Sequence, residues 1–162
     1  MKKYSLKLRG FTLIEILIVI ALIAILATII FIAINPAKRF QEANNTARRA
    51  HLGAMLDAIG LRIVDNKGAY TSASCADIPS AISTIGTGAG NYDLATCIVP
   101  DYLGILPTDP TGDTTGSACT PTWTNETSYQ TCYQIIKNAA GRVTISAPYA
   151  EGNPAPTISV TR

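Results

Sequence analysis

The chain begins with a long, uninterrupted apolar stretch close to its N-terminus. Residues 11–34 read FTLIEILIVIALIAILATIIFIAI, in which Glu15 is the one ionisable side chain. An α-helix rises about 1.5 Å per residue, so this stretch is long enough to span the roughly 30 Å hydrocarbon core of a bilayer. We therefore predict a transmembrane helix over residues 11–34.

An amphipathic segment follows over residues 35–68. Asn35-Pro36 predicts a kink or short break, because proline lacks a backbone donor and disfavours helical dihedrals in the residue before it. From residue 37 to about residue 66 helical spacing returns in two apolar stripes. One contains Phe40, Ala43, Ala47 and Ala50, and the other contains Leu52, Leu56, Ile59 and Ile63. Asn66, Lys67 and Gly68 predict the end of this helix.

The remaining residues, 69–162, predict a small head that ends in β-strands. Residues 69–128 are rich in Thr, Ser, Gly and Pro, and we expect loops with brief turns there. Strands are predicted over 129–137, 142–147 and 157–161, with a hairpin turn at 138–141. The whole pattern predicts an α+β fold, in which a long N-terminal helix packs its amphipathic half on a small antiparallel sheet.

Charge adds an orientation to this picture. The chain has 13 basic and 11 acidic residues, and four of the basic ones, Lys2, Lys3, Lys7 and Arg9, precede the apolar stretch. The positive-inside rule then predicts a single pass with a cytoplasmic N-terminus. The remaining charge is slightly acidic, so that no specific nucleic acid is expected as a partner.

Four cysteines, Cys75, Cys97, Cys119 and Cys132, lie beyond the apolar stretch. None forms a C-x-x-C motif, so a zinc or redox site is not indicated. An even number fits disulfides in an oxidising compartment. Three pairings are open, and we favour Cys75–Cys97 with Cys119–Cys132, because the second bond would pin a Thr/Pro-rich loop to a predicted strand.

The order of the N-terminal features differs from that of a secretory signal peptide, which is cleaved after its apolar stretch. Here the small residue Gly10 precedes the stretch, and residues 9–15 read RGFTLIE. This motif resembles the type III signal of type IV pilins and type II secretion pseudopilins. The resemblance is strong over 9–34 and continues more loosely through the amphipathic helix and the Leu106–Pro110 loop into the C-terminal strands.

The resemblance implies a maturation pathway. A prepilin peptidase would remove the basic leader, residues 1–10, between Gly10 and Phe11, and the new Phe11 amine would be N-methylated. The chain would first sit in the lipid of the inner membrane, and its assembly machinery would then build copies of it into a cell-surface or periplasmic filament. Glu15 would pair with the Phe11 amine of a neighbouring subunit, whereas the simpler alternative is that Glu15 snorkels to the membrane interface.

The function implied is structural assembly of a pilus-like filament that serves adhesion, motility or DNA uptake. Two alternatives are a pseudopilin of a type II secretion system and a membrane-anchored binding module that does not polymerise. The sequence contains no constellation of nucleophile, base and orienting group, so we do not expect an enzyme.

Other candidate residues receive simpler interpretations. The loop carboxylates Asp93, Asp101, Asp109 and Asp113 could bind calcium, as major pseudopilins often do, but turn formation is favoured and no cofactor is expected. His51 is interpreted as a solvated or interfacial residue, and residues 86–90 as a flexible loop. Lys38, Arg39, Arg48 and Arg49 are interpreted as a solvated helix face, and the acceptor-like Asn44 and Asn125 receive no role.

Overall fold

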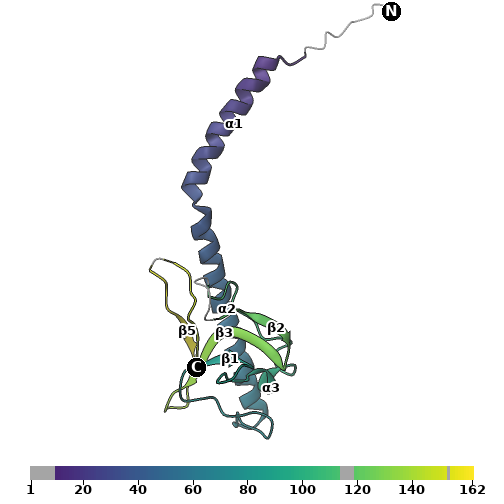
Figure 1. Cartoon of the computed structure of the whole chain (residues 1–162), viewed down its shortest axis with the longest axis vertical. Helices are drawn as coiled ribbons and strands as arrows, with labels where there is room; N and C mark the ends of the chain where they lie inside the picture. The colour runs from purple at the N-terminus through teal and green to yellow at the C-terminus, as the bar shows by residue number, and fades with distance from the viewer. Residues whose placement is uncertain (1–9, 114–118, 153) are drawn as a thin grey trace, which may run out of the picture. The chain divides into compact units, whose positions relative to one another are not determined.

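The computed structural model describes residues 10–113, 119–152 and 154–162, so that of the predicted leader it describes Gly10 alone. The chain forms two compact units, which are divided in sequence between Arg39 and Phe40 and are described separately. Figure 1 shows the helices and strands of the chain, most of them labelled. They are α1 (Leu13–Ile34), α2 (Pro36–Asp65), β1 (Ser83–Gly86), α3 (Ala95–Ile98), β2 (Thr122–Asn125), β3 (Ser128–Lys137), β4 (Val143–Ala147) and β5 (Ile158–Thr161).

The first unit is formed mainly by α1. Its sequence contains neither glycine nor proline, and its leucines and isoleucines tolerate helical geometry well. The hydroxyl of Thr28 donates to the Ala24 carbonyl oxygen at 2.9 Å, so this polar group is satisfied within the helix. Every residue from Phe11 to Phe31 is exposed. The predicted apolar helix is therefore present and presents apolar side chains on all sides.

The break predicted at Asn35-Pro36 is confirmed. Asn35 caps the end of α1 in a left-handed conformation, with φ of 43°, which asparagine tolerates better than most residues. Its side-chain oxygen and its carbonyl oxygen both accept from the Lys38 amide, at 3.4 and 3.1 Å. Pro36 then occupies the first position of α2, where a missing amide proton costs nothing.

The predicted end of α2 is also confirmed. The helix ends at Asp65, and the chain reverses through Lys67 and Gly68, whose φ angles are 56° and 95°. The Gly68 amide donates back to the Ile63 carbonyl oxygen at 2.8 Å, which satisfies one of the last helical acceptors.

The second unit contains a five-stranded antiparallel sheet in the order β1-β3-β4-β5, with β2 also paired to β3. The predicted hairpin between β3 and β4 is confirmed, since Asn138 and Gly141 close its turn and Gly141 has a φ of 79°. In the register of this hairpin Ile135 lies opposite Ile145, and both are fully buried. The alternation of Val143, Ile145 and Ala147 thus faces the core.

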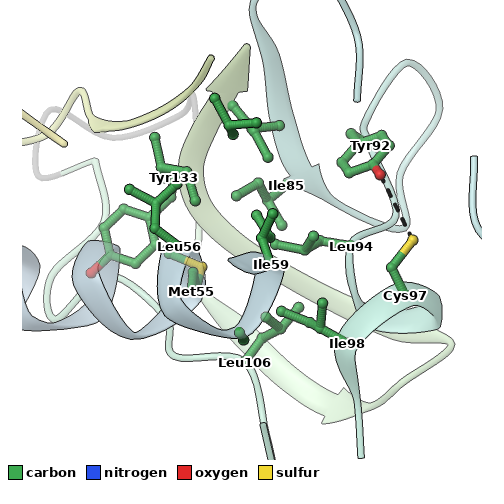
Figure 2. Close-up of a cluster of buried hydrophobic side chains, with 14 of the residues drawn as sticks. Met55, Leu56, Ile59, Ile85, Tyr92, Leu94, Cys97, Ile98, Leu106 and Tyr133 are labelled. Atoms are coloured by element: carbon green, nitrogen blue, oxygen red, sulfur yellow. Dashed lines mark hydrogen bonds between the residues drawn. The ribbon is translucent and has the colours of Figure 1, made fainter. Parts of the chain in front are cut away.

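The core lies between this sheet and one face of α2. Leu52, Leu56 and Ile59 are buried there, as the second apolar stripe predicts, in one cluster with residues of β1, β3, β4 and β5. In Figure 2 Met55, Leu56 and Ile59 project from α2 toward the sheet. The first stripe is different, because Phe40 is 71% exposed and its alanines are exposed or half-buried. Within this unit the buried residues of α2 begin at Asn45.

The expectation of loops alone over residues 69–128 is wrong, because β1, α3 and β2 lie in this region. Each of these elements has four residues, too few to show a periodic pattern. β1 and β2 are held by pairing with β3, for example Ser83 with Ile135 and Trp123 with Tyr129. Tertiary pairing therefore overrides the loop-like composition.

The packing of α2 generates a stability prediction. Replacing buried Leu52 by alanine should lower the free energy of unfolding by about 2–5 kcal/mol, because it leaves a cavity against the sheet. Leu61→Ala on the same helix is the matched control, since Leu61 is 55% exposed and its loss should cost about 0.5 kcal/mol or less. Urea unfolding of the two variants in detergent micelles checks this difference. Equal losses of unfolding free energy would contradict the assignment of Leu52 to the core face of α2.

Candidate functional site

The predicted processing junction lies in an exposed, non-helical segment just before α1. Gly10 and Phe11 are both outside regular secondary structure, and the Phe11 side chain is 82% exposed. A Cβ placed on Gly10 would meet no heavy atom within 4 Å. A backbone this open is accessible to a peptidase.

A capping box begins α1 directly after this junction. The Glu15 amide donates to the Thr12 hydroxyl at 3.3 Å, and the Thr12 amide donates to Glu15 Oε2 at 3.2 Å. The Thr12 hydroxyl also lies 3.3 Å from the same carboxylate oxygen. The first amides of a helix have no partner within it, and an apolar helix in lipid has no water to supply one. Glu15 therefore satisfies a backbone donor of its own chain.

This local role of Glu15 is additional to the assembly and snorkelling roles considered from the sequence. The signal for it is present in residues 12–15, TLIE, because Thr-x-x-Glu before an apolar run is the capping-box signature. The structure thus brings together Gly10, Phe11, Thr12 and Glu15 within one helical turn of the junction.

The apolar helix meets the requirements of a membrane span. Residues Leu13–Phe31 are long and apolar enough to cross a bilayer, judged by length and composition, and none of them is buried. These 19 exposed residues, of which Glu15 and Thr28 alone are polar, form far more apolar surface than water-soluble monomers usually leave uncovered. We infer that α1 is covered by lipid or by other helices.

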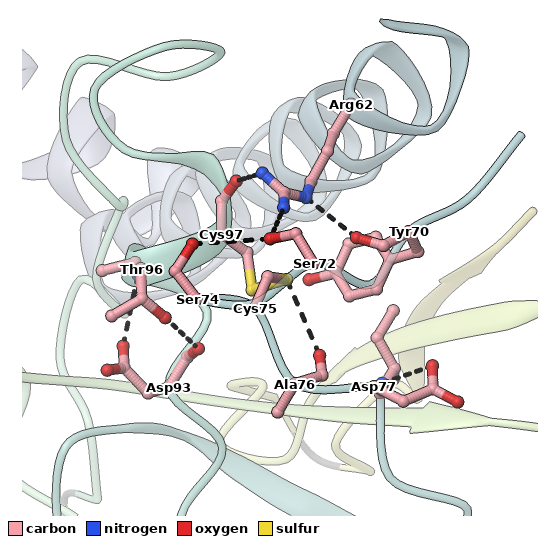
Figure 3. The surroundings of a disulfide bond; sticks show 12 residues. Arg62, Tyr70, Ser72, Ser74, Cys75, Ala76, Asp77, Asp93, Thr96 and Cys97 are labelled. Atoms are coloured by element: carbon pink, nitrogen blue, oxygen red, sulfur yellow. Dashed lines mark hydrogen bonds between the residues drawn. A yellow bond between two sulfur atoms is a disulfide. The ribbon is translucent and has the colours of Figure 1, made fainter. Parts of the chain in front are cut away.

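The first disulfide joins Cys75 to Cys97, with a Cα–Cα distance of 5.0 Å, and ties the segment after α2 to α3. Figure 3 shows Arg62 of α2 reaching over this bond. Its guanidinium donates to the carbonyl oxygens of Cys97 and Tyr70, at 2.6 and 3.0 Å, and to the Ser72 hydroxyl at 2.9 Å. The buried Arg62 therefore anchors both sides of the disulfide loop to α2.

The second disulfide joins Cys119 to Cys132 in β3, with a Cα–Cα distance of 5.7 Å. Gln130 donates to the Cys119 sulfur at 3.5 Å, which adds a second contact between the loop and the strand. The two bonds are the pairs that the sequence hypothesis favours.

Arg48 corrects an expectation, because it is fully buried rather than part of a solvated helix face. Its Nε and Nη2 atoms donate to the two carboxylate oxygens of Asp109, each at 2.8 Å. Nη2 also donates to the Thr111 hydroxyl at 2.7 Å, and Nη1 donates to Asn45 at 2.9 Å. This bidentate pair holds the Leu106–Pro110 loop against α2. Sequence spacing does not reveal this ion pair, because Arg48 and Asp109 are 61 positions apart.

Asn45 extends this buried cluster to the connection between β4 and β5. Its amide group exchanges two hydrogen bonds with the Glu151 backbone, at 2.6 and 3.0 Å, and Asn44 donates to the Glu151 carboxylate at 2.9 Å. The Glu151 carboxylate lies 3.9 Å from Nη1 of Arg48. Asn45 and Arg48, at the start of the buried face of α2, thus hold two loops that are distant from α2 in sequence.

The electrostatics of this cluster keep Asp109 ionised. Burial acts to raise the pKa of Asp109, but hydrogen bonds from Arg48, Thr111 and Gly112 and the charge of Arg48 outweigh it and hold the pKa below its usual value. His51, expected to be solvated or interfacial, is half-buried, and its Nδ1 atom lies 2.8 Å from the Tyr133 hydroxyl. Burial lowers the pKa of His51 despite the opposing effects of Asp109 and Thr108, so its imidazole is neutral at neutral pH.

The loop carboxylates do not gather into a metal site within the residues described. No group of three or more His, Cys, Asp or Glu side chains there could hold an ion. Asp109 forms the turn that its Asp-Pro sequence favours, since Oδ1 accepts from the amides of Thr111 and Gly112 at 3.0 and 2.8 Å. Asp93 accepts from the Tyr129 hydroxyl at 2.8 Å. Asp101 is exposed and Asp113 half-buried.

Comparison with known families gives one match. Residues 7–31 match the prokaryotic N-terminal methylation motif, which is the prepilin-type cleavage and methylation signal of type IV pilin-like proteins. Neither the curated proteins nor the solved structures contain a match to this chain. The matched residues include the junction, the capping box and most of α1, and together with this apolar helix they indicate membrane anchoring.

The buried ion pair generates a test with a neighbouring control. Arg48→Met should lower the free energy of unfolding by about 3–5 kcal/mol, because it leaves the buried Asp109 carboxylate without its cation. Arg49→Met removes the same charge from an exposed position one residue later. It should change the free energy of unfolding by about 0.5 kcal/mol or less. Chemical unfolding compares the two, and a small loss for Arg48→Met would mean that water reaches the pair.

Proposed function

We propose that this chain is a structural subunit of a type IV pilus-like filament that serves adhesion, motility or DNA uptake. The observation that carries the proposal is the methylation motif at residues 7–31. It includes the apolar helical residues Leu13–Phe31, none of which is buried. A processing signal placed before the apolar segment leaves that segment attached to the head after cleavage. The helix is then available first to lipid and afterwards to the helices of other copies.

Processing creates the chemical group that Glu15 needs. Cleavage between Gly10 and Phe11 by a prepilin peptidase releases the basic leader and exposes the Phe11 amine, whose reference pKa is about 7.7–8.0. N-methylation would leave this amine able to carry a proton. A cation at the start of α1 is disfavoured by the positive end of the helix dipole, and the Glu15 carboxylate compensates for it.

The cost of Glu15 in lipid supports an intermolecular role. A carboxylate near the centre of a membrane helix costs about 2.5–3.5 kcal/mol on insertion scales, and the cost is smaller near the interface. A glutamine could maintain the capping box at much lower cost, so capping alone does not explain a charged residue. In a staggered filament the carboxylate of one subunit would neutralise the Phe11 amine of its neighbour in a dry helical core.

The topology follows from the same features. Basic residues before the apolar segment would keep the leader in the cytoplasm, where the peptidase acts at the inner membrane, and the head would face the oxidising side. The two disulfides of the head suit that compartment. The inner-membrane assembly machinery would then extract the subunit into a surface or periplasmic filament.

A pseudopilin of a type II secretion system would carry the same signal and would use the same chemistry, so the location of the filament distinguishes the two. Four cysteines and an irregular head favour the pilus. A membrane-anchored module that does not polymerise has no need for the Gly10-Phe11 junction with Glu15. Electron microscopy of sheared cell-surface filaments, with mass spectrometry of their subunits, tests the proposal directly.

The first expected outcome concerns the mature N-terminus. Intact-mass analysis of the membrane and filament forms should give a chain that starts at Phe11, carries one added methyl group and contains two disulfides. Gly10→Leu should retain the leader, because a large side chain replaces the small residue at an otherwise unobstructed junction. Assembled subunits that still carry residues 1–10 would refute this assignment.

The second expected outcome separates the charge of Glu15 from its hydrogen bond. Glu15→Gln keeps an acceptor for the Thr12 amide and removes the charge, so we expect normal membrane insertion and at least a tenfold loss of sheared filaments. Glu42→Gln, an exposed position in α2, is the control and should leave the yield unchanged. Wild-type yield from Glu15→Gln would show that capping is the main role of Glu15.

A further inference from the structure

The head has an open hollow of about 330 Å³ on the side of the β2–β3 hairpin, remote in sequence from the methylation motif. It is lined by Gly104, Ile105, Trp123, Asn125, Glu126 and Thr127. Trp123 is the single tryptophan of the chain, and it is half-buried on β2. One part of the Trp123 side chain packs against the core cluster, and another part lines the open hollow.

The Trp123 indole is held in a fixed position by Tyr129. The Trp123 ring stacks in a tilted arrangement on Tyr129, with 5.1 Å between ring centroids. The Tyr129 hydroxyl in turn donates to Asp93 at 2.8 Å and accepts from the Ala95 amide at 3.0 Å. A ligand that stacks on this indole would therefore pay little entropy for ordering it.

The hollow also has a second apolar wall. Ile105 is 61% exposed and follows Gly104, which has no side chain to obstruct the opening. An indole and an isoleucine together offer a short apolar strip. This strip suits a ligand that has one apolar face of limited size.

The polar lining groups have defined hydrogen-bonding roles. Asn125 Oδ1 accepts from the Thr127 amide at 3.0 Å and from its hydroxyl at 2.9 Å. This pattern fixes the orientation of the Asn125 amide and leaves its Nδ2 group as a donor for a ligand. The Thr127 hydroxyl, which already donates, retains lone pairs to accept, and the Glu126 carboxylate is a further acceptor. The hollow thus offers one donor group and two acceptor groups beside the apolar strip.

We propose that this hollow binds a neutral saccharide. A sugar ring has an apolar C–H face for the indole, and hydroxyl groups that both donate and accept. The lining contains a carboxylate and no cationic side chain, which disfavours phosphates and acidic sugars. A wholly apolar ligand is also disfavoured, because it would leave Glu126 and Asn125 desolvated without partners.

Binding at this hollow does not require the filament, so its test is independent of the assembly proposal. The full chain is kept in micelles of lauryldimethylamine oxide, which has no sugar headgroup, and the emission of Trp123 is followed as oligosaccharide is added. Maltotriose, chitotriose and lactose are the neutral probes, and 3′-sialyllactose is the anionic counterpart of lactose. We expect a saturable emission change with at least one neutral probe, and binding at least tenfold weaker for an acidic sugar than for its neutral counterpart.

Paired variants assign the effect to the hollow. Ile105→Ala and Glu126→Gln should each weaken binding about tenfold, whereas Ile82→Ala, at a comparably exposed isoleucine elsewhere, should not change it. Absence of saturation with all neutral probes, or an equal loss in Ile82→Ala, would overturn the proposal. So would strong protection of Trp123 from acrylamide in sheared filaments relative to micelles, because a neighbouring subunit would then occupy the hollow.

Discussion

The apolar side chains of Leu13–Phe31 are exposed on every side of α1, and none of them is buried. The head, residues 40–162, forms a hydrophobic core of its own, and residues Leu13–Phe31 belong to the other compact unit. The apolar helix must therefore have another environment, either lipid or the helices of neighbouring chains. Under the proposed processing, cleavage before this helix would retain it, and the mature chain would then have both an anchor and an assembly surface. This constraint connects the methylation motif with the division of the chain into two units.

The head is small, and its interactions compensate for a limited core. One face of α2 supplies Leu52, Leu56 and Ile59, but much of residues 69–128 is irregular and contributes few long elements. Two buried arginines and two disulfides hold these irregular segments in place. Arg62 holds both sides of the first disulfide loop, and Arg48 holds the Leu106–Pro110 loop. In the chain-entropy model a bond that closes about 15 residues contributes roughly 3 kcal/mol, which is appreciable for a domain of this size.

Those parts of the fold that depend on local sequence were predictable. The stripe from Leu52 to Ile59, the break at Asn35 and the hairpin turn at Asn138 each follow from spacing or from the conformational preferences of a few residues. β1 and β2 were missed because their pairing with β3 spans tens of positions, and a four-residue strand has no visible period. Arg48 was misassigned for the same reason, since only the folded chain brings Asp109 beside it. The capping box, by contrast, is a local signature in residues 12–15 that a closer reading of the sequence could have identified.

Glu15 and Asp109 combine charge with backbone hydrogen bonding in a similar way. Each carboxylate accepts from amides that the secondary structure leaves unpaired, Thr12 for Glu15, and Thr111 with Gly112 for Asp109. Asp109 has its cation within the head, because Arg48 is provided by α2. No basic side chain lies in α1, so a cation for Glu15 must come from outside that helix or from the chain terminus itself. In the proposed processing, cleavage after Gly10 would produce such a cation at Phe11, one residue before the capping box. The same carboxylate would then stabilise the start of its own helix and also select the neighbour that supplies an unpaired terminal amine.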